Sequence, residues 1–145
     1  MGIRTQGARI VEIAFLPRTS TVLAPTDAAA ERACAQIERY VQDPDYRFAL
    51  ALEPQGTDFQ RRVWKSIDRI PRGCTRSYGD IAGELGSAAR AVGQACGQNP
   101  YPIVTPCHRV VSASGLGGFA HHAGGYLIQA KRWLLAHEGA IGAKP

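Results

Sequence analysis

The chain has 145 residues, of which 45% are hydrophobic and 20% charged, with a formal net charge of +5. This composition excludes a disordered protein and a disulfide scaffold, because a chain of this size can bury a core of its own. It contains no run of about 18 apolar residues and no secretory-type N-terminus, so we expect no membrane association and a cytoplasmic location. The basic charge suits a polyanionic partner but fits a solvated surface as well.

The N-terminal residues 1–53 are predicted to form a small structural α/β lobe. Alternating apolar residues over 9–17 predict a strand whose two faces carry Ile10, Glu12 and Ala14 on one side and Val11, Ile13 and Phe15 on the other. Thr26 and Asp27 open a helical pattern over 27–42, with its apolar face at Ala30, Cys34, Ile37 and Val41. Residues 47–54 are consistent with a short strand or an extended link.

Residues 54–145 begin with helical patterns that carry clear start signals. Thr57 and Gln60 form a capping-box pattern before a helix with Phe59, Val63 and Ile67 at helical spacing. A second capping box at Ser77 and Asp80 precedes a short helix whose inward residues are Ile81, Ala82 and Leu85.

Another short helix is predicted over 88–98. Gly86 ends the helix before it, Ser87 caps it, and its inner face carries Ala88, Val92 and Cys96. Two short helices joined by a glycine turn predict a helix-turn-helix, although helical hairpins that do not bind DNA share this outline.

The C-terminal part combines an irregular segment, a loop and a helix. The stretch "NPYPIVTPCHRVVS", residues 99–112, contains three prolines and is expected to be extended. A glycine-rich loop follows, and the last helix ends at Gly139. One face of that helix carries Leu127, Lys131, Leu134, Leu135 and Glu138. Because an unpaired buried charge costs several kcal/mol, Glu138 is expected to pair with a histidine, an arginine or a water.

The four cysteines are Cys34, Cys74, Cys96 and Cys107. They show no CxxC pair and no zinc-type Cys/His spacing, so we predict reduced thiols and no metal. Cys34 and Cys96 fall on apolar helix faces, which favours core packing for both.

Cys107, His108 and Glu138 supply the residue types of an activated cysteine. A free thiol has a pKa of about 8.5, so a working nucleophile needs an imidazole, oriented by a third group, that holds it as the thiolate. Neighbouring residues of an extended segment point opposite ways, so we expect a water between Cys107 and His108 and a contact from His108 to Glu138.

The residue types leave other interpretations of this triad open. A buried cysteine beside a histidine that only satisfies a backbone carbonyl would show the same residues. Arg109 is assigned to structure, as a charge partner or surface group. A cysteine peptidase is disfavoured, because its nucleophile usually begins a helix and Cys107 follows a proline-broken extended run.

Four segments together resemble the O6-alkylguanine-DNA alkyltransferases, also called methylated-DNA–protein-cysteine methyltransferases. They are "GTDFQRRVW", "IPRGCTRSYGDIA", "AARAVGQACGQNPYPIVTPCHRVV" and "KRWLLAHEGA", which span roughly residues 54 to 140. We therefore expect an α+β fold, with a small N-terminal lobe containing a short sheet over 1–53. A mainly helical domain over 54–145 would carry the helix-turn-helix, the active-site extended segment, DNA binding and the alkyl acceptor.

The resemblance implies single-turnover DNA repair without a cofactor. A monomer would bind double-stranded DNA through the minor groove and flip an O6-alkylguanine, or an O4-alkylthymine, out of the stack. The alkyl group would move to Cys107, with His108 and Glu138 as the water-linked relay and Tyr78 protonating the departing guanine at N3.

The resemblance also assigns DNA-binding and positioning residues. Arg90 would fill the gap in the base stack, and the DNA-binding positions are Ser77, Tyr78, Ala89, Arg90, Ala91 and Gly93. Asn99 matches the family's hinge, Phe119 its lid, and Lys131 a lysine of its closing helix. His121 and His122 lie in an insertion in the lid and are expected to be solvent-exposed.

Two other functions stay open beside repair. One is an alkyltransferase-like protein that recognises the lesion without repairing it, although such proteins carry another residue at the acceptor position. The other is a regulator that uses alkylated cysteine as a signal, for which the chain supplies neither a second DNA-binding region nor a metal-thiolate switch.

Overall fold

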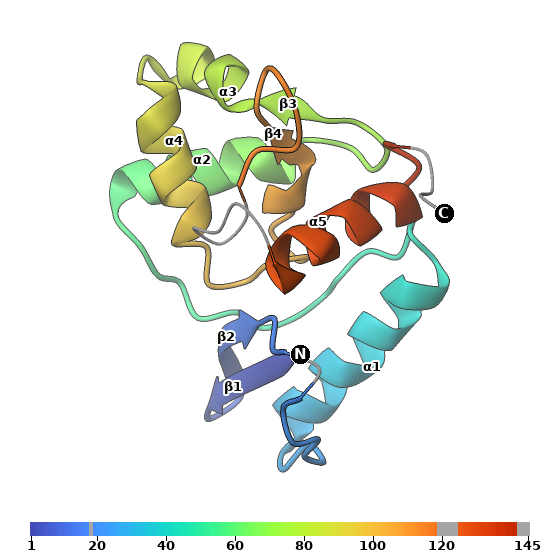
Figure 1. Cartoon of the computed structure of the whole chain (residues 1–145). Helices are drawn as coiled ribbons and strands as arrows, with labels where there is room; N and C mark the ends of the chain where they lie inside the picture. Colours follow the sequence, from blue (N-terminus) through green and yellow to red (C-terminus); the bar gives the residue numbers. More distant parts are fainter. Residues whose placement is uncertain (18, 119–124, 142–145) are drawn as a thin grey trace. The chain divides into compact units, whose positions relative to one another are not determined.

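The computed structural model describes residues 1–17, 19–118 and 125–141. The chain divides into two compact units, Met1–Pro54 and Gln55–Pro145 (Figure 1). Short two-stranded pairings and helices confirm the predicted α+β class. Across the described ranges, no helix has the length and apolar character that crossing a membrane requires.

The first unit contains a β-hairpin of β1 (Gly2–Gln6) and β2 (Arg9–Ala14). The sequence patterns predicted β2 and missed β1. The strict alternation predicted for β2 is wrong, because the register shifts between Arg4 and Thr5: Arg4 pairs with Glu12 and Thr5 with Ile10, so Val11 lies in a bulge between the two pairs. This β-bulge turns the strand, so that Ile10 and Ile13 are both buried despite their odd spacing.

Helix α1 (Ala28–Gln42) packs on both strands of the hairpin. It begins where predicted, with the Asp27 side chain accepting a hydrogen bond from the Ala30 amide. The predicted apolar face is partly wrong: Val41 is 48% exposed and Cys34 is half-buried, whereas Tyr40 is buried. The Tyr40 ring lies 5.7 Å from the ring of Phe48 and occupies the inner face in their place.

The segment after α1 is the expected extended link. Leu52 makes a single parallel bridge with Ile10, and the Ile10 carbonyl accepts a hydrogen bond from the Glu53 amide over 2.9 Å. The link is therefore joined to the hairpin without becoming a full strand.

The second unit is built around α2 (Asp58–Asp68), α3 (Tyr78–Leu85) and α4 (Ala89–Gly97). Both predicted capping boxes are present, at the starts of α2 and α3. Gly86 ends α3 in the left-handed conformation at φ 65°, and α4 packs against both α2 and α3.

The start and inner face of α4 differ from the prediction. Ala88, not Ser87, is the N-cap, and it makes no side-chain capping bond. Val92 and Ala95 are buried, whereas Ala88 is exposed and Cys96 is half-buried. The reason is that Ala88 lies before the first residue of the helix. The buried face of α4 therefore consists of Val92 and Ala95, which are three residues apart.

The predicted extended segment contains a tight turn. Cys107–Arg109 form a single 3₁₀ turn, η1, immediately before β4 (Val110–Val111), which pairs in parallel with β3 (Arg76–Ser77). In a 3₁₀ turn successive side chains are rotated by about 120°, so Cys107, His108 and Arg109 point in three directions. An alternating strand would instead have placed Cys107 and Arg109 on one face.

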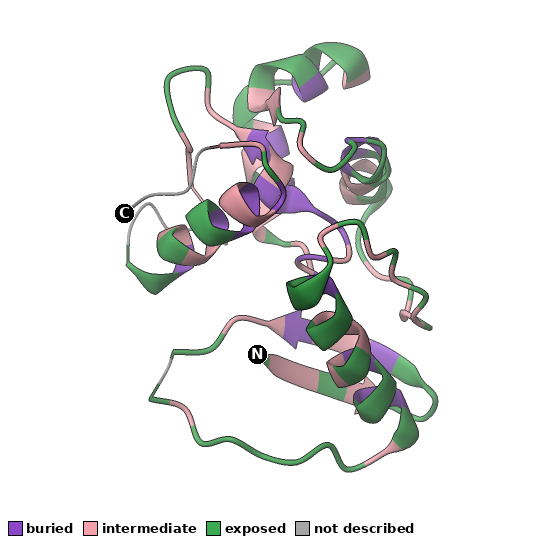
Figure 2. Cartoon of the chain, turned by 90° about the vertical axis from the view of Figure 1, so that its right-hand side faces the viewer, coloured by how far each residue is buried: buried purple, intermediate pink, exposed green. Residues whose placement is uncertain are grey.

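Helix α5 (Tyr126–His137) closes the unit against η1. Its predicted inner face is confirmed, since the buried residues are Leu127, Lys131, Leu134, Leu135 and Glu138 (Figure 2, purple). The helix ends at His137 with Glu138 as its C-cap, and Gly139 follows in the left-handed conformation at φ 79°, as the glycine predicted.

Candidate functional site

Cys107 lies at the start of η1 and is 4% exposed. Its sulfur accepts a hydrogen bond from Asn99 Nδ2 over 3.2 Å, and its side chain also hydrogen-bonds that of Cys96 on α4. The candidate nucleophile is thus enclosed by the end of α4 and the segment that follows it.

The acidity of this thiol differs from the expectation. The hydrogen bond to Cys96 and burial raise the pKa of Cys107 well above its ordinary value, and the Asn99 amide, which lowers it, does not offset them. The prediction that the protein holds Cys107 as an anion is therefore wrong for the free protein. Deprotonation has to accompany the reaction, because only the thiolate is a strong nucleophile.

A buried charge cluster surrounds the neighbouring imidazole. Glu138 Oε2 lies 2.9 Å from His108 Nε2, and both side chains are fully buried. Arg109 donates from Nε to Glu138 Oε1 and from Nη2 to Oε2, each over 2.9 Å, and from Nη1 to the Ile70 carbonyl. Glu138 was expected to pair with a histidine, an arginine or a water, and it pairs with both His108 and Arg109.

The cluster fixes the tautomer of His108. Burial lowers the pKa of His108, and the contact with Glu138 opposes this without reversing it, so the ring is neutral near pH 7. A carboxylate paired with arginine only accepts hydrogen bonds, so Nε2 carries the proton. Nδ1 is then the basic nitrogen; it is buried and has no hydrogen-bond partner within the described part of the chain.

Tyr78 and Lys131 meet on the backbone that precedes the glycine-rich loop. The Gly118 carbonyl accepts hydrogen bonds from the Tyr78 hydroxyl over 3.2 Å and from Lys131 Nζ over 2.8 Å. Lys131 Nζ also donates to the Val110 carbonyl over 2.7 Å and lies 5.8 Å from the centroid of the Tyr78 ring. Lys131 thus joins α5, β4 and Gly118.

Both side chains have shifted acidity. Burial, reinforced by the nearby Cys96 and Cys107 side chains, raises the pKa of Tyr78, so its phenol stays protonated. Burial lowers the pKa of Lys131 to about 8, against an opposing contribution from the same two thiols. Because Cys96 and Cys107 contribute to the pKa shifts of both Tyr78 and Lys131, these four side chains are electrostatically coupled.

Asn99 connects α4 to the turn that carries Cys107. Besides its contact with the sulfur, Nδ2 donates to the Thr105 carbonyl over 2.9 Å, and Oδ1 accepts from the Tyr101 amide over 2.9 Å. The sequence predicted a hinge residue here but not its direct contact with Cys107.

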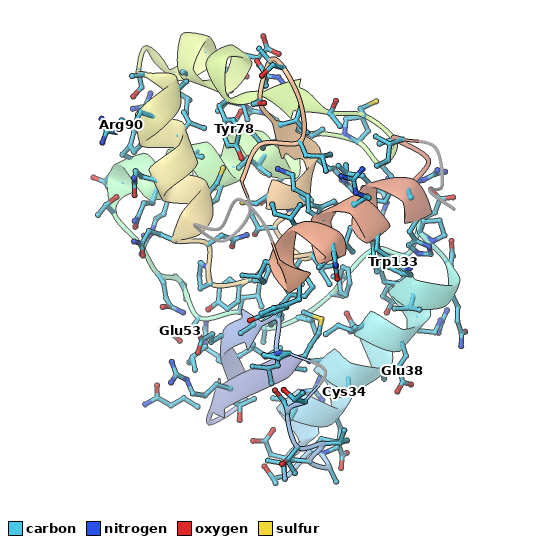
Figure 3. The ribbon with its side chains drawn as sticks, viewed as in Figure 1. Cys34, Glu38, Glu53, Tyr78, Arg90 and Trp133 are labelled. Carbon is cyan, nitrogen blue, oxygen red and sulfur yellow. The ribbon has the colours of Figure 1, made fainter. Side chains whose placement is uncertain are left out.

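The predicted DNA-facing residues lie on α3, on α4 and at Ser77, the N-cap of α3. Arg90 and Ala89 are exposed, and Ala91 and Gly93 are partly exposed. Figure 3 shows Arg90 projecting outward from α4. Ser77 is engaged in the capping box of α3. Phe119, His121 and His122 lie outside the described residues.

Sequence reasoning missed the position of one residue of the site, Cys96. It was assigned to the core, yet its side chain contacts Cys107. No motif marks this, because the contact depends on how the end of α4 lies over η1.

The chain matches the family model described as 6-O-methylguanine DNA methyltransferase, DNA binding domain, over residues 58–140. A methylated-DNA–protein-cysteine methyltransferase of Mycobacterium bovis is 45% identical over 133 residues, which cover 90% of this chain and 77% of that protein.

Solved structures agree with this match. A crystal structure of Mycobacterium tuberculosis OGT in complex with DNA has a TM-score of 0.78 at 42% identity, covering 95% of this chain and 85% of that one. An O6-methylguanine DNA methyltransferase from Methanococcus jannaschii has a TM-score of 0.70 at 26% identity, covering 99% and 90%. The chain therefore belongs to the methylated-DNA–protein-cysteine methyltransferase family.

Proposed function

We propose that Cys107 accepts the alkyl group from O6-alkylguanine, and from O4-alkylthymine, in double-stranded DNA. As a member of its family, the chain binds DNA and repairs it by transferring an alkyl group to one of its own cysteines. One observation carries the choice of Cys107. Cys107 is followed in the chain by a neutral, buried His108, whose Nε2 lies 2.9 Å from Glu138 Oε2 and whose Nδ1 is left to accept a proton.

The proton of the thiol leaves through His108. In the proposed step, a water carries the proton from Cys107 to Nδ1, and Glu138 stabilises the imidazolium that forms. Because Arg109 holds both carboxylate oxygens, the ring keeps its orientation while its charge changes. The raised pKa of Cys107 keeps the sulfur protonated until this transfer takes place.

The sulfur then displaces guanine from the alkyl carbon. The new carbon–sulfur bond forms as the carbon–O6 bond breaks, and its electron pair passes into the purine ring. Tyr78, which burial keeps protonated, donates a proton to N3, so that guanine leaves neutral. The thioether has no route back to a thiol, so each molecule acts once.

The helix-turn-helix is proposed to bind the minor groove. Flipping a base costs a few kcal/mol, and the exposed Arg90 can offset part of this cost by filling the gap in the stack. The small residues Ala89, Ala91 and Gly93 allow a close approach of α4 without reading base edges. We expect Arg90→Ala to weaken repair more than duplex affinity, and equal losses would make Arg90 a phosphate contact.

The other proposed roles follow the contacts of the site. Asn99 is the hinge between the helix-turn-helix and η1, and Lys131 holds the base of the lid to which Phe119 belongs. Monomeric state and cytoplasmic location stay predictions. The alternative, an alkyltransferase-like protein that only recognises the lesion, is disfavoured by the cysteine at position 107.

Transfer of a labelled methyl group from an O6-methylguanine oligonucleotide tests this function. We expect Cys107→Ser and Cys107→Ala to abolish transfer while duplex binding persists. Cys74→Ser is the matched control, because Cys74 is an exposed thiol of the same unit. Transfer by either Cys107 variant would contradict the proposal.

A further inference from the structure

Two free thiols meet at the proposed acceptor. The side chains of Cys96, in the last turn of α4, and Cys107, in η1, are hydrogen-bonded to one another. Asn99 joins both segments, since its amide donates to the Cys96 carbonyl over 3.2 Å and its side chain donates to the Cys107 sulfur over 3.2 Å. Alkyl transfer to Cys107 gives the second thiol no role.

We infer that Cys96 and Cys107 form a reversible disulfide under hydroperoxide, which suspends alkyl transfer and protects the acceptor from irreversible oxidation. The functional consequence rests on the proposed role of Cys107, whereas the formation of the bond does not. The pair constitutes a modification site inside the reaction centre.

Exposure sets the order of the two oxidation steps. Cys96 is half-buried, whereas Cys107 is 4% exposed, so a small oxidant meets Cys96 first. The Cys96 thiolate attacks one oxygen of hydrogen peroxide, breaks the O–O bond and becomes a sulfenic acid, and the hydroxide released takes up a proton to give water.

The second step closes the bond between the two sulfurs. Cys107 loses its proton and attacks the sulfur of the Cys96 sulfenic acid, whose hydroxyl leaves as a second water. Two thiols and one peroxide thus give one disulfide and two waters. Lys131, whose ammonium interacts electrostatically with both thiols, stabilises the anion that attacks in each step.

The position of Cys96 explains what the bond would protect. A sulfenic acid without a neighbouring thiol is oxidised further to sulfinic acid, which thiol reductants do not reverse. Cys107 is the thiol beside Cys96, so it captures the Cys96 sulfenic acid as a disulfide, and in that disulfide the Cys107 sulfur is no longer a thiol that peroxide can oxidise.

The test uses full-length protein carrying Cys34→Ala and Cys74→Ser, so that only this pair remains. After treatment with hydrogen peroxide, free thiols are blocked with iodoacetamide and the protein is digested with trypsin. Because the nearest arginines are Arg90 and Arg109, both cysteines fall in one peptide, residues 91–109. We expect this peptide to be two hydrogens lighter and unlabelled, and methyl transfer to fall at least about tenfold and recover with dithiothreitol.

The comparison variant adds Cys96→Ser to the same background. Its Cys107 should be oxidised without forming a disulfide, and dithiothreitol should fail to restore the lost transfer. The inference is overturned if peptide 91–109 of the Cys34→Ala, Cys74→Ser protein (the pair protein) is labelled by iodoacetamide after peroxide treatment. It is also overturned if dithiothreitol restores methyl transfer equally well in the Cys96→Ser protein. The untreated pair protein separates the two proposals: if it transfers no methyl group the proposed function fails, while the peptide mass still decides the disulfide.

Discussion

Removing the charge of Glu138 should destabilise the protein strongly. Glu138 is fully buried and accepts hydrogen bonds from His108 and, through both oxygens, from Arg109, whose side chain is only 14% exposed. Glu138→Gln keeps the shape but leaves the guanidinium without its counter-ion. Breaking a buried ion pair by removing one partner costs about 3–5 kcal/mol, and the glutamine oxygen keeps one contact, so we expect about 3 kcal/mol.

Urea denaturation followed by circular dichroism measures this loss. The free energy of unfolding of a domain is about 5–15 kcal/mol, so a loss of about 3 kcal/mol should lower the urea concentration at the unfolding midpoint by a large fraction. Arg69→Gln is the matched control: it breaks a pair with Glu84 in which the Arg69 side chain is 65% exposed, and it should cost less than about 1 kcal/mol. If Glu138→Gln costs no more than Arg69→Gln, the carboxylate does not hold the cluster together.

Three further variants test the electrostatics of the site. Tyr78→Phe should slow single-turnover methyl transfer by about 10²-fold, because it removes the hydroxyl that donates the proton to N3; an unchanged rate would exclude that role. Cys96→Ala removes the largest cause of the raised pKa of Cys107, so the pH midpoint of iodoacetamide labelling at Cys107 should fall, and a rise would contradict this assignment. Lys131→Met tests the lowered pKa of Lys131 through the pH dependence of stability. Between about pH 8 and the unfolded-state pKa of 10.5, Lys131 binds more protons in the unfolded state than in the folded state, so the unfolding free energy of the wild type should rise with pH relative to the variant, by up to about 3 kcal/mol. A difference that does not change with pH would place the pKa of Lys131 near its ordinary value.

Local patterns predicted the elements whose signals lie close together in sequence. Both capping boxes, the left-handed glycines that end α3 and α5, and the inner face of α5 follow from residues that lie within one helix or at its ends. The partnership of Glu138 with histidine or arginine also follows locally, because a carboxylate among leucines requires a charged or polar partner.

Features that depend on distant contacts were not predictable in this way. The bulge at Val11 arises from pairing with β1, and the burial of Tyr40 arises from Phe48. The pKa of Cys107 was expected to fall because its sequence neighbour is a histidine. In the fold a cysteine eleven positions earlier hydrogen-bonds the thiol and burial adds to its effect, so the pKa rises.

The most direct test of Cys107 as a single-use acceptor is mass spectrometry after reaction with excess O6-methylguanine duplex. A single transfer to Cys107 predicts one added methyl group per protein molecule, on peptide 91–109, with fragment ions that place it on Cys107. It also predicts one repaired base per protein. A methyl group on Cys96 or elsewhere, or more repaired bases than protein molecules, would contradict it.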